Sequence, residues 1–152
     1  MLASFLMGLV GGQRAMTPLA AVSIAAARGK LPEDDTPGFM AHPLVAVGAT
    51  LLAIAELAGD KQKTAPDRIV PIGLAARFVT SAIAGAVLAP RRQRWLGAGV
   101  GGVTAVVASY PGWRARMAFI PKYGQTPSGL VEDMLVILSA AGVITMVERS
   151  GE

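Results

Sequence analysis

The chain has 152 residues, of which 53% are hydrophobic and 16% charged, and its mean hydropathy is +0.51. Soluble domains carry about 25% charged residues, so the composition disfavours a soluble Ala-rich helical domain and favours closely packed membrane helices. The absence of cysteine and the single histidine, His42, exclude disulfides, thiolate metal sites and a multi-histidine site within one chain. The net charge is +4, but the basic residues cluster at the ends of apolar runs, so we expect lipid rather than nucleic acid as partner.

The first apolar run covers residues 1–27 and is interrupted by a Gly-Gly-Gln-Arg segment ending at Arg14 and by Pro18. No basic segment precedes it, so we expect it to belong to the protein rather than to a signal peptide. Gly8 and Gly12 form a small-xxx-small pair, which is typical of helix packing in membranes. The run is either one kinked span, the simpler interpretation, or two half-helices that meet near Arg14. Discontinuous helices of the second kind recur at transporter binding sites.

Residues 28–42 are polar and turn-rich, and we expect a solvated loop, including the acidic segment 33–35. The second predicted span, 43–58, ends in a polar cluster. Glu56 and Asp60 are four residues apart and share one helix face, and Lys61 follows. A carboxylate inside an apolar run needs a partner, water or a proton.

The third predicted span, 69–89, carries Arg77 about two turns inside and ends at a tight basic turn, 90–94. The fourth, 95–110, contains the small-xxx-small pair Gly97 and Gly101. Trp95 and Tyr110 bracket this span as an aromatic belt does.

The connection 111–129 is basic and rich in turn residues, and its middle is predicted to lie at the membrane interface as a short amphipathic segment. The last apolar run is 130–147. Glu132 and Asp133 stand in its predicted first turn, where acidic residues complement the helix dipole. They are alternatively site residues.

We therefore predict an all-α, polytopic helical membrane protein with about five spans in a single domain, 1–152. Arg14 and Thr17 resemble Arg77 and Thr80, 63 residues later, which suggests a parallel two-helix repeat followed by a final helix. Both arginines are expected to point into the bundle from helices of the same direction. The Lys and Arg counts on the two sides tie at six each, so the positive-inside rule gives no orientation. The tight basic turn favours its own side as cytoplasmic, with the N-terminus opposite.

Three elements taken in order resemble a known family: Gly12-Gln-Arg14-Ala before an apolar helix, Glu56-Leu-Ala-Gly-Asp60-Lys61 with Pro66-Asp67, and Glu132-Asp133. They are similar to the bacterial membrane family catalogued as domain of unknown function 4126, over about residues 11–147. Gln13 departs from the aliphatic residue of that pattern. The resemblance implies an integral membrane protein and supplies no activity.

The leading functional hypothesis is a transporter or channel, multi-pass in the bacterial inner (cytoplasmic) membrane and homodimeric or otherwise homo-oligomeric, with the transported solute undefined. Intramembrane charges often mark such pathways. The alternative is a lipid-binding or scaffold subunit of a membrane complex in which the same charges form a static network. A membrane enzyme with Mg²⁺ on carboxylates is less favoured, because no nucleophile or phosphate motif accompanies them. We predict no catalytic residues, metal or cofactor.

The candidate substrate or ion site comprises Arg14, Thr17, Glu56, Asp60, Lys61, Asp67, Arg77, Thr80, Glu132 and Asp133. The candidate lipid-headgroup contacts are Arg91, Arg92, Arg94, Arg114, Arg116 and Lys122. Glu56 is expected to contact Arg14 or Arg77. Asp60 is expected nearer the headgroups, with Lys61 or Arg68.

Overall fold

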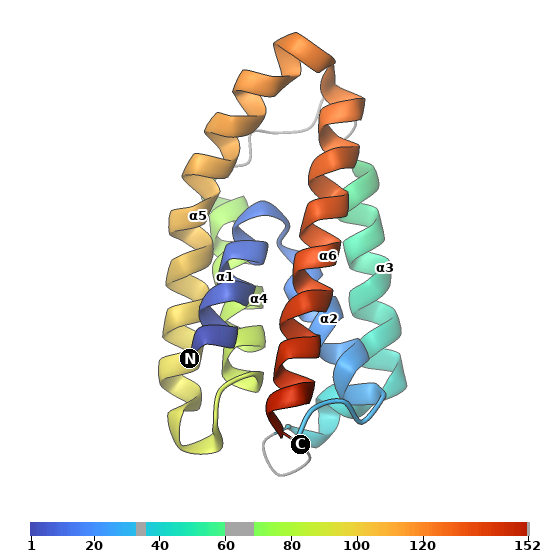
Figure 1. Cartoon of the computed structure of the whole chain (residues 1–152), viewed down its shortest axis with the longest axis vertical. Coiled ribbons are helices and arrows are strands. Elements are labelled where there is room, and N and C mark those ends of the chain that lie inside the picture. The colour runs from blue at the N-terminus through green and yellow to red at the C-terminus, as the bar shows by residue number, and fades with distance from the viewer. Residues whose placement is uncertain (33–35, 60–68, 152) are drawn as a thin grey trace.

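The computed structural model describes residues 1–32, 36–59 and 69–151, and its regular structure is entirely helical. The all-α prediction is therefore confirmed for this part of the chain. The elements are α1 (Leu2–Gln13), α2 (Met16–Ala27), the 3₁₀ turn η1 (Gly38–Ala41), α3 (Pro43–Gly59), α4 (Pro71–Val87), the 3₁₀ turn η2 (Arg91–Gln93), α5 (Arg94–Tyr123) and α6 (Gln125–Gly151). The six α-helices alternate in direction along the chain (Figure 1).

The first apolar run is two antiparallel helices, not one kinked span (Figure 1). α1 ends at Gln13, and Arg14 adopts an extended backbone with φ −140° and ψ 120°. Pro18 is the third residue of α2, within the first turn, where a backbone N–H group would have no intrahelical acceptor. The extra reversal brings both termini toward the same end of the bundle, where α2 and α6 end and η2 lies (Figure 1). The N-terminus therefore lies toward the same end of the bundle as the basic turn, not opposite it as predicted.

The connection 111–129 is also helical rather than turn-rich. Pro111 and Pro121 lie inside α5, each at the loss of one helical hydrogen bond, and the chain reverses only at Gly124. Gly124 has φ +85°, a left-handed backbone conformation that favours glycine. Because α6 begins at Gln125, Glu132 lies about two turns inside the helix, and the predicted first-turn dipole role is wrong.

The helix order supports the predicted repeat in part. α2 and α4 run in one direction, and α3 and α5 run back in the other (Figure 1). Both arginines of the repeat are buried, as predicted. However, Arg77 lies within α4, whereas Arg14 lies in the break before α2.

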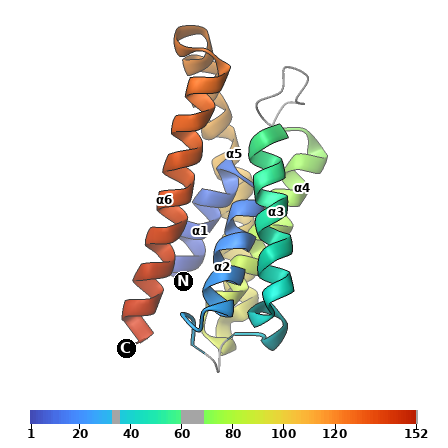
Figure 2. The ribbon, with the colours of Figure 1, turned by 90° about the vertical axis from the view of Figure 1, so that its right-hand side faces the viewer.

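Small residues bring α1, α4 and α5 together. A side chain at Gly8 would meet the Gly101 carbonyl oxygen at 2.7 Å, and one at Gly12 would meet Ala108 at 2.6 Å, so α1 packs directly on α5. Gly97 and Gly101 in turn pack against the backbone of α4 at Gly85 and Ser81. Both predicted small-xxx-small pairs thus lie in helix–helix contacts. Figure 2 shows α6 on the opposite side of the α1–α2 hairpin from α3.

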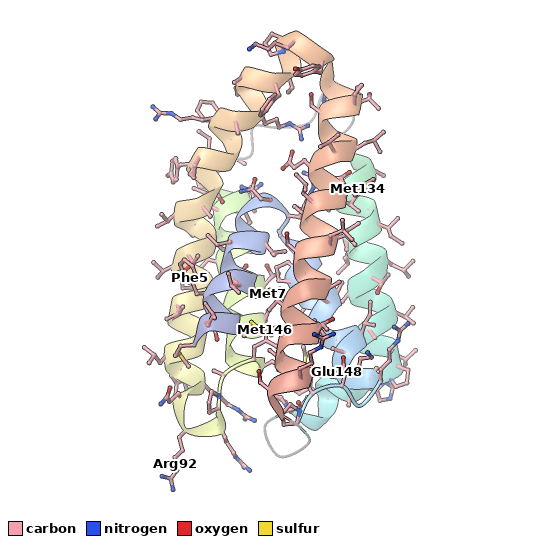
Figure 3. The ribbon with its side chains drawn as sticks, viewed as in Figure 1. Phe5, Met7, Arg92, Met134, Met146 and Glu148 are labelled. Carbon is pink, nitrogen blue, oxygen red and sulfur yellow. The ribbon has the colours of Figure 1, made fainter. Side chains whose placement is uncertain are left out.

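The inverted side-chain distribution of this chain means that large apolar side chains are as common on its outside as in its interior, unlike in a water-soluble domain. The buried interior consists mostly of small residues (alanine, glycine and serine) with two arginines, and it also holds a cluster of larger apolar side chains that includes Met7, Val22 and Met40. Large apolar side chains stand on the outside of α3 to α6, as the side-chain view illustrates for Met134 (Figure 3). The most exposed among them include Leu44, Leu51, Ile54, Ile72, Val103, Val107, Val131, Leu135 and Leu138.

Within the described residues, one helix is long and apolar enough to cross a bilayer by length and composition, namely α6 over Gln125–Ser150. α1 to α4 are apolar but shorter, with 12 to 17 residues each. The helical class is therefore established.

Candidate polar site at the tip of the α1–α2 hairpin

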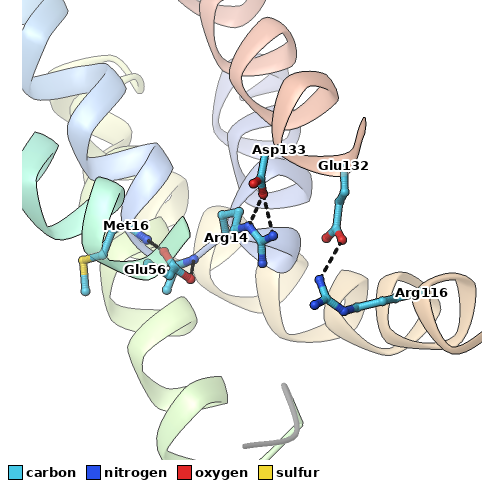
Figure 4. A network of polar contacts seen from close by, with 7 residues as sticks. Arg14, Met16, Glu56, Arg116, Glu132 and Asp133 are labelled. Carbon is cyan, nitrogen blue, oxygen red and sulfur yellow. Dashed lines mark hydrogen bonds and ion pairs between the residues drawn. The ribbon is translucent and has the colours of Figure 1, made fainter. Parts of the chain in front are cut away.

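Arg14 is held by α6. Its Nε and Nη2 atoms donate to Oδ1 of Asp133 at 2.8 and 2.5 Å, and the two residues are 1% and 6% exposed. The pair joins residues 119 positions apart in the chain (Figure 4). Because two opposite charges out of contact with water need each other, this ion pair fixes the tip of the hairpin against α6.

Glu56 does not form the predicted ion pair with Arg14 or Arg77. Its two carboxylate oxygens accept hydrogen bonds from the backbone N–H groups of Ala15 and Met16, each at 2.8 Å (Figure 4). These donors are at the first turn of α2, which has no intrahelical acceptor for them and carries the positive end of the helix dipole. The Glu56 carboxylate of α3 therefore caps the start of α2. Backbone donors at a helix start can take the place of an arginine as the partner of a carboxylate.

Arg77 joins α4 to α5 and α1. Its Nη1 lies 3.4 Å from Oγ of Ser109, and that hydroxyl oxygen lies 3.2 Å from the carbonyl oxygen of Gly12. The Gly12 carbonyl is among the last of α1, where helical partners are missing. The same hydroxyl oxygen lies 2.8 Å from the Ala105 carbonyl oxygen, so by distance its single hydrogen bonds within α5, and Ser109 places the buried Arg77 beside the end of α1.

A small open pocket lies beside the hairpin tip, with a volume of about 310 Å³. It is formed by α2, α3 and α4, and its lining includes Met16, Glu56 and Arg77. A carboxylate, a guanidinium and the N-terminus of α2 therefore meet at one opening. This opening is therefore the candidate site for a small polar or charged solute.

The remaining candidates are distributed as follows. Thr17 is buried and is the second residue of α2, and Thr80 is buried in α4, where its hydroxyl donates to the Ala76 carbonyl at 2.9 Å. Asp60, Lys61 and Asp67 lie outside the described residues, as do Arg68 and the acidic segment 33–35. Among the described residues, no three His, Asp or Glu side chains are grouped to hold a metal ion.

The predicted headgroup contacts lie toward the two ends of the bundle. Arg91 and Arg92 lie in η2 and are exposed, and Arg94 begins α5 directly after η2. Arg92 points away from the bundle (Figure 3). Near this end Lys30 binds Glu148 at 3.0 Å. The other basic group lies on the second half of α5, where Arg114 and Lys122 are exposed and Arg116 binds Glu132 of α6 at 3.3 Å (Figure 4).

Two structural residues were not anticipated from the sequence. Ser109 and Ser4 are both buried, and the Ser4 hydroxyl donates to the Gly85 carbonyl at 2.9 Å, joining α1 to α4. Their signal is a hydroxyl within an apolar run, where a polar group requires a partner.

No family model, no curated protein and no solved structure matches this chain. The similarity to the domain of unknown function 4126 therefore stays a prediction based on its motifs.

Proposed function

We propose that the chain is a small multi-pass protein of the cytoplasmic membrane that passes a small charged solute through the polar pocket at the hairpin tip. The observation that carries the membrane assignment is the inverted side-chain distribution. Monomeric water-soluble proteins rarely expose contiguous apolar surface on this scale, whereas lipid favours large apolar side chains outside and small or paired polar ones inside.

The dimensions of α5 support this assignment. Trp95 stands at its first turn with 92% of its surface exposed, and Arg114 follows 19 residues later. At 1.5 Å per residue this separation is about 28 Å, close to the roughly 30 Å hydrocarbon core of a bilayer. An aromatic and a basic side chain would then sit at opposite interfaces, as is common in membrane helices. The shorter α1 and α2 would enter and leave from the same side.

The hairpin supports a transport role. Two half-helices that end inside a bundle expose backbone groups and charges to an interior opening, an arrangement that recurs at solute sites of transporters. At the pocket, the N-terminus of α2 and Arg77 suit an anion. The Glu56 carboxylate would compete with that anion for the backbone N–H donors at the start of α2. An anion would therefore enter as Glu56 leaves the helix start.

The second candidate function is a lipid-binding or scaffold subunit with a static network. It is favoured by the Arg14–Asp133 ion pair, which is hydrogen-bonded and buried away from water. In this case the capping by Glu56 is structural as well. A homo-oligomer stays a prediction under both functions.

The two candidates are separated by Glu56→Gln in proteoliposomes. An uncharged amide retains the shape and one acceptor oxygen but loses the charge at the helix start. In a transporter, anion flux measured with a panel of small anions is abolished or decoupled while the melting temperature in detergent is nearly unchanged. Absence of flux in the parent protein, together with a lower melting temperature in the variant, would favour the scaffold. Thr145→Val on α6, outside the pocket, is the control.

A further inference from the structure

A long apolar groove runs between α5 and α6, with α1 as its floor. Its volume is about 1010 Å³. The α6 wall is a single helical stripe that includes Val131, Leu135, Ser139 and Gly142, and α5 contributes Phe119. The polar pocket at the hairpin tip shares no lining residue with this groove.

The groove is open to the side of the bundle. Val131 and Leu135 line it and are each 61% exposed. In Figure 1 α5 and α6 meet at the top, where the chain turns at Gly124, and separate below it, with α1 between their lower halves. The opening thus faces the surface that the inverted side-chain distribution assigns to lipid.

The charged residues of the groove lining, Arg116 and Glu132, lie in its upper part. Arg116 and Glu132 face each other across its upper part, and Lys122 lies less than two turns farther along α5. α5 carries no acidic residue over Arg94–Tyr123. Arg114 is also exposed, but helix spacing places it on the side of α5 opposite Arg116, outside the groove lining, so the positive charge at this end comes from Lys122 and from Arg116 in its pair with Glu132. From Glu132 the groove continues to Met146, 14 residues or about 21 Å along α6. That length covers one leaflet of a hydrocarbon core of roughly 30 Å.

We propose that this groove holds one acyl chain of an anionic phospholipid, with the phosphate at the basic end near Arg116 and Lys122. This inference rests on the membrane location proposed above, but not on transport. A lipid fits better than a second copy of the chain. A two-fold axis along the membrane normal would bring the basic ends of two α5 helices together, and like charges repel. An anionic headgroup instead complements them.

Gly142→Leu tests the acyl chain directly. A Cβ at Gly142 has no heavy atom within 4 Å, so a leucine there fills the groove without disturbing helix contacts. Gly99→Leu is the matched control, because Gly99 is also helical, open and outside the groove lining. Ser139→Leu is a second groove-filling variant.

The measurement is native mass spectrometry of the full chain after exchange into detergent with phosphatidylglycerol or phosphatidylcholine. We expect the parent and Gly99→Leu to retain phosphatidylglycerol preferentially. Both groove-filling variants should retain it about tenfold less, as expected for displacing about two methylene groups. Lys122→Gln should weaken the headgroup preference, whereas Arg114→Gln on the other side of α5 and Arg91→Gln/Arg92→Gln at the other end should keep it.

Equal retention by Gly142→Leu and Gly99→Leu would overturn the proposal, as would equal retention of the two lipids by the parent. Conversion of a dimer to a monomer by Gly142→Leu would identify a second copy as the occupant and also overturn it. Alkaline carbonate extraction separates the two levels of failure. Protein that stays in membranes without lipid preference refutes the groove site alone, whereas protein released by carbonate refutes the membrane location as well.

Discussion

Removal of one member of the Arg14–Asp133 pair should be strongly destabilising, whereas removal of both should not. Arg14→Leu leaves the Asp133 carboxylate without its guanidinium partner at a position that is 6% exposed. Asp133→Leu removes the carboxylate partner of the Arg14 guanidinium, at a position that is 1% exposed. An uncompensated charge in such surroundings is the costly species, not the absence of the ion pair itself.

The magnitude follows from this burial. Breaking a buried pair on one side costs about 3–5 kcal/mol, whereas replacing both partners by apolar residues is often neutral or stabilising. Each single variant should therefore lose about 3–5 kcal/mol of unfolding free energy. The double variant should recover most of that loss, giving a coupling energy of several kcal/mol in a double-mutant cycle.

The assay is reversible unfolding in mixed micelles of SDS and a mild detergent, followed by far-UV circular dichroism. Lys30→Leu with Glu148→Leu provides a matched cycle for the more exposed Lys30–Glu148 ion pair, where the coupling should be below about 1 kcal/mol. Single variants of Arg14 and Asp133 that unfold like the parent would refute a buried ion pair. So would additive losses in the double variant.

Two further predictions concern the packing and the path of the chain. Gly101→Leu should lower the unfolding free energy by at least about 1–3 kcal/mol in the same assay, because a side chain there meets the carbonyl of Ser81. The control variant Gly99→Leu should leave the unfolding free energy unchanged. Equal stability of the two variants would contradict the α4–α5 contact. The chain has no cysteine, so single cysteines can be introduced at Ser150, next to an N-terminal tag, and at Ser128. The first two should react with a membrane-impermeant maleimide from one side of the membrane, and the one at Ser128 from the other side. Labelling of the two chain ends from opposite sides would contradict the α1–α2 hairpin.

The features that could be predicted from the sequence depend on local spacing. Helix periodicity and the four-residue spacing of Gly8/Gly12 and Gly97/Gly101 gave the helical class and two packing faces, because such pairs share a face in any helix. Burial of Arg77 followed from its depth inside an apolar run.

The partners of the charges could not be predicted in this way. Asp133 lies 119 residues from Arg14, and its meeting with Arg14 depends on the reversal between α1 and α2 and on the length of α6. The reversal was one of two interpretations of the first run. The predicted α6 is too short, because Pro127 indicates a turn in the sequence, whereas it is the third residue of α6 and so lies within its first turn. Glu56 was assigned a cationic partner because backbone donors at the start of α2 become apparent only once the break is known.

The central claim is that the apolar exterior faces lipid, and spin-label accessibility tests it most directly. Leu51 on α3, Val107 on α5 and Leu138 on α6 are 61%, 63% and 62% exposed. Each can carry a nitroxide on a single introduced cysteine in liposomes, since the chain has no cysteine of its own. We predict high accessibility to dissolved oxygen and low accessibility to a water-soluble nickel chelate at all three positions. High accessibility to the nickel chelate at these positions would contradict the membrane assignment.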